Sequence, residues 1–417
     1  MCGIVGYVGA KEVSPILLEG LKRLEYRGYD SAGIAVRTSE GQMQVVKTQG
    51  KLKRLVQMLE GNEPCGTQGL GHTRWATHGA PNDLNAHPHT DCTGRLVVIH
   101  NGIIENFAEL RAELLSRGHI FRSETDTEVL AHLLEDEFAA RGANSPLALV
   151  DATRAALGRV RGAYALGVMD ARVPDLIVGA RHFSPLVVGL GEGENLLASD
   201  IPALLAHTRR ALGIEDGEVV ALTSDSVRLY TLGGEPVERD PFEVTWNVES
   251  AEKGGYPHFF LKELNEQPTS LANTLRGRIN DHVDLPELNS IDLSRVERVH
   301  LVACGTSYNS ALVGKLAIEQ WARLPVQAEI GSEYRYESPV IDAHTLGIFI
   351  SQSGETADTL ASLRLARECG AQTIALTNVV GSSITRGTDA VLYLRVGPEI
   401  GVVASKTFTA QVTLLEL

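Results

Sequence analysis

The sequence has few basic residues, few aromatic residues and no long apolar run. Its 417 residues carry 38 Lys and Arg against 52 Asp and Glu, for a formal net charge of −14. A chain with this charge is poorly suited to nucleic acid or to an anionic membrane surface, and we expect neither as a partner. It has no uninterrupted apolar stretch with a length of about 18 residues, and no cationic start followed by an apolar run. We therefore expect a cytoplasmic protein.

Cysteine is also scarce, and the chain has no cofactor fingerprint. The five cysteines are widely spread, at Cys2, Cys65, Cys92, Cys304 and Cys369. Such spacing indicates reduced thiols instead of a disulfide framework. His87-Pro88-His89 lies near Cys92 but lacks the repeated spacing of zinc modules, so we expect no metal. Neither a Walker A motif nor a GxGxxG turn precedes a predicted helix, and we expect no cofactor.

Cys2 is the first residue with a possible chemical role. Removal of Met1 would leave an amino-terminal cysteine followed by the apolar strand 3–6. A thiol is a good nucleophile, and a terminal amine, with a pKa of roughly 7.7–8.0, can accept the thiol proton. One residue would then supply both nucleophile and base. The alternative is that Cys2 is only a small residue in an ordinary chain start.

The segment 71–79 is rich in hydrogen-bond donors and suits a small zwitterion. Arg74 offers a planar fork for a carboxylate, and Thr77 and His78 offer shorter donors. Trp75 offers a large ring that can cover a pocket. These residues predict a binding loop for an amino acid.

Two further segments fit the same chemistry. The buried strand predicted over 96–100 would deliver Asn101 and Gly102 at its end, where an amide and a backbone N–H make a plausible oxyanion hole. Asp126 precedes a helical run and could face a ligand ammonium group. The alternative for this segment is helix capping by Ser123, Thr125 or Asp126.

Five motifs, in this order along the chain, carry a family resemblance: 2–6, 27–33, 72–79, 100–102 and 124–128. Together they resemble the glutaminase domain of the glucosamine-6-phosphate synthase family, within the N-terminal-nucleophile hydrolase superfamily. The resemblance implies these roles: Cys2 attacks the glutamine amide, Asn101 and Gly102 hold the oxyanion, Arg74 and Asp126 bind the α-carboxylate and α-ammonium groups, Thr77 and His78 line the pocket, and Trp75 gates ammonia.

The chain is long enough for at least two cores. In its first part we predict helices near 14–23 and 126–140, and short β runs at hairpin-like spacing over 177–180, 186–189 and 219–222. This mixture fits a layered α/β fold, for which the resemblance implies an αββα sandwich. We predict a glutamine amidotransferase type 2 domain over 1–240, a linker over 241–284 and a first sugar isomerase (SIS) domain over 285–417.

The last part alternates strands and helices. Five apolar runs, at 299–303, 326–330, 346–350, 373–376 and 391–394, are separated by helix-length segments, which predicts a doubly wound parallel sheet. Hydroxyl-rich turns, 304–307 and 351–356, follow two of these runs and open helices. Such turns can bind phosphate through hydroxyls and helix N-terminal amides, or they can be simple helix caps. They resemble the family's first SIS domain, which implies phosphate contacts from Ser307, Ser351, Gln352, Ser353 and Thr356.

The resemblance implies an amidotransferase that makes glucosamine 6-phosphate and glutamate from fructose 6-phosphate and glutamine, and a homodimer for the full-length enzyme. The family carries a second SIS domain after this one, so we expect a chain that ends early and retains glutaminase activity only. Near the end, Ala404 stands where the family has a sugar-contacting Ser. The alternatives are a glutaminase feeding another acceptor, as in phosphoribosyl amidotransferases, and a non-catalytic sugar-phosphate-binding regulator.

Overall fold

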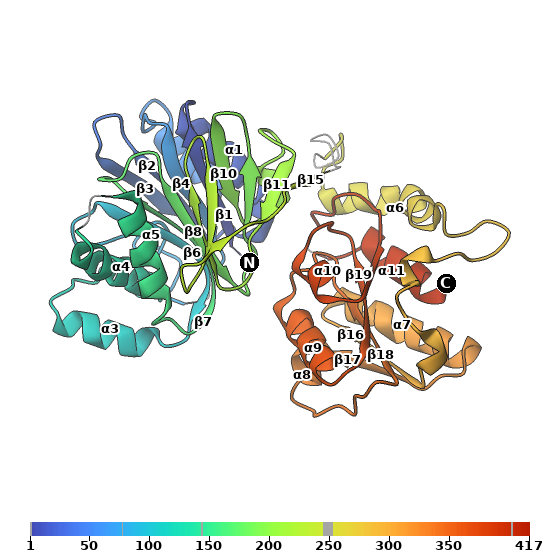
Figure 1. Cartoon of the computed structure of the whole chain (residues 1–417). Coiled ribbons are helices and arrows are strands. Elements are labelled where there is room, and N and C mark those ends of the chain that lie inside the picture. Colours follow the sequence, from blue (N-terminus) through green and yellow to red (C-terminus); the bar gives the residue numbers. More distant parts are fainter. Residues whose placement is uncertain (1, 77, 143–144, 245–252, 402) are drawn as a thin grey trace. The chain divides into compact units, whose positions relative to one another are not determined.

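The computed structural model describes residues 2–76, 78–142, 145–244, 253–401 and 403–417. The chain divides into two compact units, Met1–Thr245 and Trp246–Leu417, each with its own hydrophobic core (Figure 1). Among the described residues, none of the helices combines the length and apolar composition needed to cross a bilayer.

The first unit contains two antiparallel sheets. The eight-stranded sheet has the order β15 (Phe242–Glu243), β11 (Arg210–Gly213), β9 (Val187–Leu190), β10 (Glu194–Ala198), β1 (Gly3–Gly9), β4 (Gln68–Arg74), β2 (Ser31–Arg37) and β3 (Met43–Gln49). The seven-stranded sheet has the order β14 (Pro236–Val237), β13 (Val227–Thr231), β12 (Glu218–Leu222), β8 (Ile177–His182), β7 (Gly162–Asp170), β6 (Leu96–Ile104) and β5 (His89–Thr90). Because β1 pairs with β4, the chain start lies beside the end of the 68–74 strand.

Alternate residues of these strands face different cores, as the period of two in a strand requires. Ile4 and Val97 belong to the core between the two sheets, whereas Val5 and Val98 face outward onto helices. The eight-stranded sheet is covered by α1 (Val13–Arg23) and α2 (Leu52–Leu59), and the seven-stranded sheet by α3 (Phe107–Ser116), α4 (Glu128–Ala140) and α5 (Pro146–Leu157). The layers are therefore α, β, β and α, and the predicted sandwich is confirmed.

Three details of this unit differ from the sequence predictions. β6 continues to Ile104, so Asn101 and Gly102 lie inside the strand, where both pair with β7. The runs at 177–180 and 186–189 form strands of different sheets and make no hairpin. Helices α2, α3 and α5 were not predicted, although Ser145 caps α5 by accepting a hydrogen bond from the Ala148 N–H.

The second unit is built on a five-stranded parallel sheet, which confirms the predicted doubly wound fold. Its order is β17 (Val326–Ile330), β16 (Arg298–Ala303), β18 (Thr345–Ile350), β19 (Gln372–Thr377) and β20 (Ala390–Tyr393). The helices are α6 (Phe259–Leu275), α7 (Thr306–Trp321), α8 (Gly331–Tyr334), α9 (Ala357–Glu368), α10 (Ser383–Gly387) and α11 (Lys406–Glu416). The strand order reverses between β16 and β18, and ligands of such sheets bind at this switch point.

The region predicted as a linker contains a helix of the second unit. Within 241–284, α6 packs on α11, and Lys406 Nζ on α11 donates to Glu266 Oε2 on α6 at 2.6 Å. Glu263 accepts hydrogen bonds from the Ile400 and Gly401 N–H groups. Pro268 lies inside α6, a position where proline ordinarily interrupts a helix. The sequence signal for this helix was weak for that reason.

Candidate active site

Cys2 is held by donors from three separate segments. The Trp75 N–H, just after β4, donates to Cys2 Sγ at 3.2 Å. The Cys2 carbonyl oxygen accepts from Arg27 Nε at 3.1 Å and from Asn101 Nδ2 at 3.0 Å. Burial raises the pKa of the Cys2 thiol, while the hydrogen bond to Trp75 and the charges of Arg74 and Arg27 oppose that shift. The thiol is therefore positioned by its surroundings before any substrate binds.

His72 fixes the orientation of the Asn101 amide. Burial lowers the pKa of His72 to about 3, so the ring is neutral near pH 7. Its Nε2 lies 2.9 Å from Asn101 Oδ1 and 3.0 Å from the His100 carbonyl oxygen. Because both partners are acceptors, Nε2 must carry the proton and donate. Asn101 then presents its Nδ2 toward Cys2.

Arg74 combines deep burial with an unused donor. Its Nη2 donates to the carbonyl oxygens of His78 and Gly79, whereas Nη1 is buried and has no hydrogen-bond partner among the described residues. Burial lowers the pKa of Arg74, and Asp126 is one of the charges that oppose this shift. An unpaired buried guanidinium nitrogen is costly. This nitrogen is the expected place for a ligand carboxylate.

The other residues predicted for the glutamine pocket are distributed around these groups. Asp126 is buried and accepts the Ile104 N–H at 2.8 Å through Oδ2. Trp75 is 43% exposed and packs edge-on against Tyr29. His78 packs edge-on against Phe107. Thr77 lies outside the described residues.

Gly102 occupies a position that excludes larger residues. Its φ is +133°, and a Cβ there would lie 1.9 Å from the Ala163 carbonyl oxygen on β7. A side chain would therefore strain the backbone and push β6 away from β7. The glycine keeps Asn101 in its place in the strand.

Arg27, Asp30 and His72 were missed as site residues, although all three lie in the quoted motifs. Arg27 joins Cys2 to Asp200, whose Oδ2 lies 2.9 Å from Arg27 Nη1. Asp30 accepts the Ala76 N–H at 2.9 Å and so ties down the loop after β4. The charges of Arg27 and Asp30 in a Gly-rich motif were the available signal, but the partners of all three residues depend on strand pairing.

His87 and His89 belong to a buried layer of neutral rings and not to a common ligand set with Cys92. His87 Nε2 lies 2.9 Å from Thr127 Oγ1, and His89 Nε2 lies 3.0 Å from Thr125 Oγ1. Burial lowers the pKa of both rings. Both histidines stabilise the wall behind His72, on which His87 stacks at 4.2 Å.

In the second unit, the predicted phosphate residues follow β16 and β18, which are neighbours in the sheet. Ser351 Oγ lies 2.9 Å from Thr356 Oγ1 and accepts the Gly354 N–H. Ser353 Oγ accepts the Glu355 N–H, and the Gln352 carbonyl oxygen accepts the Asn378 N–H. Ser307, in the first turn of α7, accepts from Gln411 Nε2 through Oγ. Strand pairing thus brings both hydroxyl turns to the switch point of the sheet.

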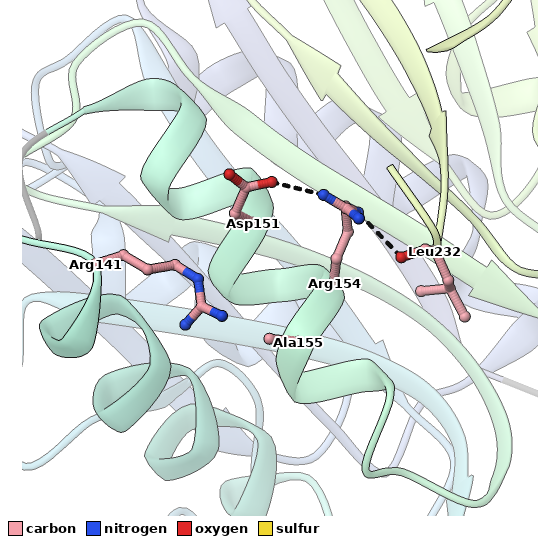
Figure 2. A pocket seen from close by; sticks show the side chains of 5 residues that line it. All are labelled: Arg141, Asp151, Arg154, Ala155 and Leu232. Atoms are coloured by element: carbon pink, nitrogen blue, oxygen red, sulfur yellow. Dashed lines mark hydrogen bonds and ion pairs between the residues drawn. The ribbon is translucent and has the colours of Figure 1, made fainter. Parts of the chain in front are cut away.

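A surface pocket of about 330 Å³ lies elsewhere, between α4, α5 and the end of β13 (Figure 2). Arg154 crosses it and donates to Asp151 Oδ1 and to the Leu232 carbonyl oxygen, and Arg141 pairs with Glu137. Its charged groups are paired within the protein and it holds none of the predicted site residues, so we assign it no function.

Comparison with known proteins agrees with this arrangement. A glutamine amidotransferase domain model matches residues 72–206, and a SIS domain model matches residues 292–417. The glutamine–fructose-6-phosphate aminotransferase (isomerizing) of Thermus thermophilus is 54% identical over 418 residues, which cover 100% of this chain and 68% of that protein. The enzyme of the same name from Symbiobacterium thermophilum is 52% identical, with the same coverage.

Among solved structures, the glutamine phosphoribosylpyrophosphate amidotransferase from B. subtilis is similar in fold. It is 19% identical, with a TM-score of 0.50, over 99% of this chain and 92% of that chain. The sequence identities to the curated relatives, over the whole of this chain, decide its family. The chain belongs to the glutamine–fructose-6-phosphate aminotransferase (isomerizing) family.

Proposed function

We propose that the first unit hydrolyses glutamine, with Cys2 as the nucleophile after removal of Met1. The observation that carries this proposal is the position of Cys2. The Trp75 N–H, just after β4, fixes its thiol, and Arg27 and Asn101 fix its carbonyl oxygen. We assign this activity to residues 1–240.

The reaction follows from the groups present. The terminal amine of Cys2 takes the thiol proton, and Sγ attacks the side-chain carbonyl carbon of glutamine. Asn101 Nδ2 and the Gly102 N–H stabilise the resulting oxyanion. The amine passes its proton to the leaving nitrogen, which departs as ammonia. Water then cleaves the thioester and releases glutamate.

Substrate recognition uses the two ends of the amino acid. Arg74 Nη1, buried and unpaired, binds the α-carboxylate, and Asp126 binds the α-ammonium group. Thr77 and His78 line the pocket. Trp75 gates the passage of ammonia. Its backbone N–H donates to the Cys2 thiol, and its ring is exposed.

We further propose that the second unit binds fructose 6-phosphate, the acceptor named in the curated relatives. The five hydroxyl and amide side chains after β16 and β18 would contact the phosphate together with amides of the α7 and α9 N-termini. In this proposal the full-length enzyme transfers ammonia from glutamine to the sugar, which gives glucosamine 6-phosphate, whereas this chain retains glutaminase activity only. The full-length enzyme would act as a homodimer.

Glutamate release by the purified 417-residue chain tests the glutaminase proposal. Intact mass should show a chain that begins at Cys2, and Cys2→Ala should lose glutamate release with unchanged melting temperature. Cys65→Ser is the matched control, because Cys65 is an exposed cysteine of the same unit. Full activity with Met1 retained would refute the proposed base, since a peptide nitrogen cannot accept the thiol proton.

A further inference from the structure

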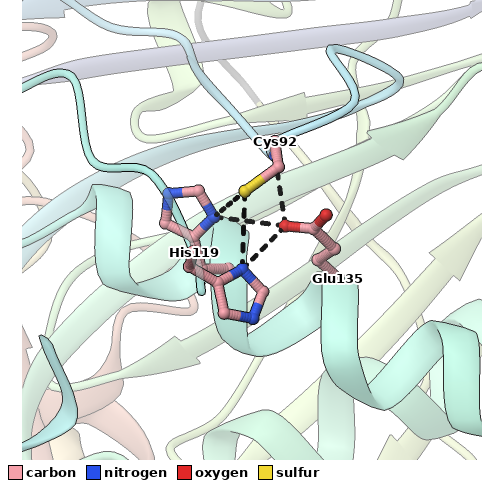
Figure 3. Close-up of side chains that lie close together, drawn as sticks. Cys92, His119 and Glu135 are labelled. Atoms are coloured by element: carbon pink, nitrogen blue, oxygen red, sulfur yellow. Dashed lines mark hydrogen bonds and ion pairs between the residues drawn. The ribbon is translucent and has the colours of Figure 1, made fainter. Parts of the chain in front are cut away.

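Four potential metal ligands converge at one point of the first unit, apart from the groups assigned to catalysis. Cys92 lies in the turn after β5, His119 follows α3, and His132 and Glu135 lie on α4. Figure 3 shows the Cys92 sulfur, the His119 ring and the Glu135 carboxylate directed at one another. Three separate segments of the chain therefore meet here.

The spacing of the four ligand atoms fits one tetrahedral ion. Cys92 Sγ lies 3.5 Å from Nδ1 of both His119 and His132. Glu135 Oε2 lies 3.0 Å from His119 Nδ1 and 3.2 Å from His132 Nδ1, and all four atoms fall within 4.8 Å of one another. Zinc bonds of about 2.0–2.3 Å place tetrahedral ligands roughly 3.3–3.8 Å apart. The two Sγ–Nδ1 distances match this range, and the two Oε2–Nδ1 distances are slightly shorter. We propose that Cys92, His119, His132 and Glu135 bind one zinc ion.

The chemistry of the donors selects the class of metal. A thiolate and two imidazoles favour zinc over calcium or magnesium, which take oxygen ligands. The thiolate and the Glu135 carboxylate together carry two negative charges, which balance Zn²⁺ when both histidines are neutral. Four protein ligands leave no open position, so this site is structural.

Groups around the cluster support the same assignment. Both histidines offer Nδ1, which leaves Nε2 to face a carboxylate: His119 Nε2 lies 2.9 Å from Asp136 Oδ1, and His132 Nε2 lies 3.7 Å from Glu128 Oε1. A carboxylate behind a ligating histidine is the usual arrangement at metal sites. The Ile120 N–H lies 3.5 Å from Cys92 Sγ, as suits a thiolate acceptor.

The proposed ion would connect distant segments of the glutaminase fold. His119 and His132 lie 27 and 40 positions after Cys92, so the ion would join the β5–β6 turn and the α3–α4 connection to α4. Glu128, which faces His132, accepts the N–H and hydroxyl of Ser123 at 2.6 Å. Ser123 begins the segment that leads to Asp126. Loss of the ion should therefore lower thermal stability and loosen the binding of glutamine.

This proposal departs from the expectation of no metal. That expectation considered only His87 and His89, the neighbours of Cys92 along the sequence, and in the fold these two bond to threonine hydroxyls instead. The ligands that accompany Cys92 in space are too far along the chain to form a recognisable spacing.

Metal analysis of the full chain tests the proposal. The chain is purified without an affinity tag that binds metal, loaded with ZnCl₂ and then dialysed. We expect about one zinc per chain in the unmodified protein, in Cys65→Ser and in Cys2→Ala. In Cys92→Ser/His132→Gln we expect at least a tenfold lower content. Equal zinc in that double variant, or none in the unmodified protein, would overturn the proposal, and loss of zinc in Cys2→Ala would move the ion to the catalytic thiol.

A second measurement does not depend on the folding of a variant. Co²⁺ loaded into the metal-free unmodified chain should give a thiolate-to-metal charge-transfer band and the strong visible bands of a tetrahedral site. Asp136→Asn, which replaces the carboxylate behind His119 and leaves the four ligands in place, should weaken Zn²⁺ affinity about 10–100-fold, whereas Arg117→Gln, which removes the other partner of Asp136, should not. Weak octahedral cobalt bands would refute tetrahedral ligation by these residues.

Discussion

His72 Nε2 lies 2.9 Å from Asn101 Oδ1, and this hydrogen bond decides which end of the Asn101 amide faces Cys2. The neutral ring can only donate here, because the second partner of Nε2 is the His100 carbonyl oxygen. The proposed oxyanion donor is thus oriented by a buried residue that makes no hydrogen bond of its own to Cys2 within the described part of the chain. His72 is a positioning residue.

We predict that His72→Leu lowers kcat for glutamine hydrolysis by about 10–100-fold with little change in KM, because Asn101 loses its fixed orientation. The same substitution in an Asn101→Ala background should cost much less, since the two residues act as a unit. Steady-state glutamate release for the four proteins measures this. Additive losses would show that His72 acts independently of Asn101.

Arg74→Lys should raise KM for glutamine by at least about tenfold, because lysine keeps the charge but loses the fork that reaches a carboxylate. Arg27→Lys is the informative comparison. Arg27 bonds the Cys2 carbonyl and Asp200, so its loss should lower kcat instead. Glutamine saturation curves separate the two effects. An unchanged KM in Arg74→Lys would contradict the carboxylate assignment.

Three buried histidines, His72, His87 and His100, predict acid lability. Burial lowers the pKa of His72 to about 3 and also lowers the pKa values of His87 and His100, so the unfolded chain binds more protons than the folded one below about pH 6.5. Stability is then complete above that pH and is lost as the pH falls. For His72 this loss is roughly 1 kcal/mol on going from pH 7 to pH 5.5, and His87 and His100 act in the same direction.

Thermal melts of the first unit across this range measure that loss. Carboxyl groups with ordinary or lowered pKa values titrate mostly below this window. His87→Gln, which keeps a polar side chain near Thr127, should therefore flatten the pH dependence of the melting temperature. An equally steep dependence in this variant would show that other groups cause it.

Several candidate residues could be proposed from the sequence because their chemistry is concentrated in short motifs. Residue type and local context singled out Cys2, Arg74 and Asn101, and the resemblance of the combined motifs to a known family supplied their roles. The roles of Arg27 and His72 are not, because they arise from strand pairing, such as Gly3 opposite Thr73, which brings the chain start beside β4. The four proposed zinc ligands come from three segments and were missed for the same reason.

Gly102→Ala should destabilise the first unit and lower activity. The substitution combines an unfavourable φ of +133° with a Cβ placed 1.9 Å from the Ala163 carbonyl oxygen. Gly118→Ala is a matched control, because Gly118 also has a positive φ, of +95°, but no atom within 4 Å of the added Cβ. We expect about 1 kcal/mol for the control and at least about twice that for Gly102→Ala. Denaturant unfolding of both variants measures the difference, and equal losses would exclude the predicted clash.

The sugar-phosphate assignment predicts that substitutions in the turns after β16 and β18 selectively weaken the binding of fructose 6-phosphate. Isothermal titration should detect fructose 6-phosphate binding to the purified chain, and inorganic phosphate should compete. Ser353→Ala/Thr356→Ala should weaken binding by about 10–100-fold, since a hydrogen bond to a charged group contributes about 1.5–3 kcal/mol.

Ser332→Ala is the control for that titration, because Ser332 is a hydroxyl of the same unit, just after β17, that donates to Glu333 and is not assigned to the phosphate site. Its affinity should match that of the unmodified chain. Glutamate release without added sugar should be unchanged in all three proteins, because every residue assigned to that step belongs to the first unit. Equal affinity in the double variant would place the phosphate elsewhere, and absence of any binding heat would contradict the assignment of these turns as a phosphate site.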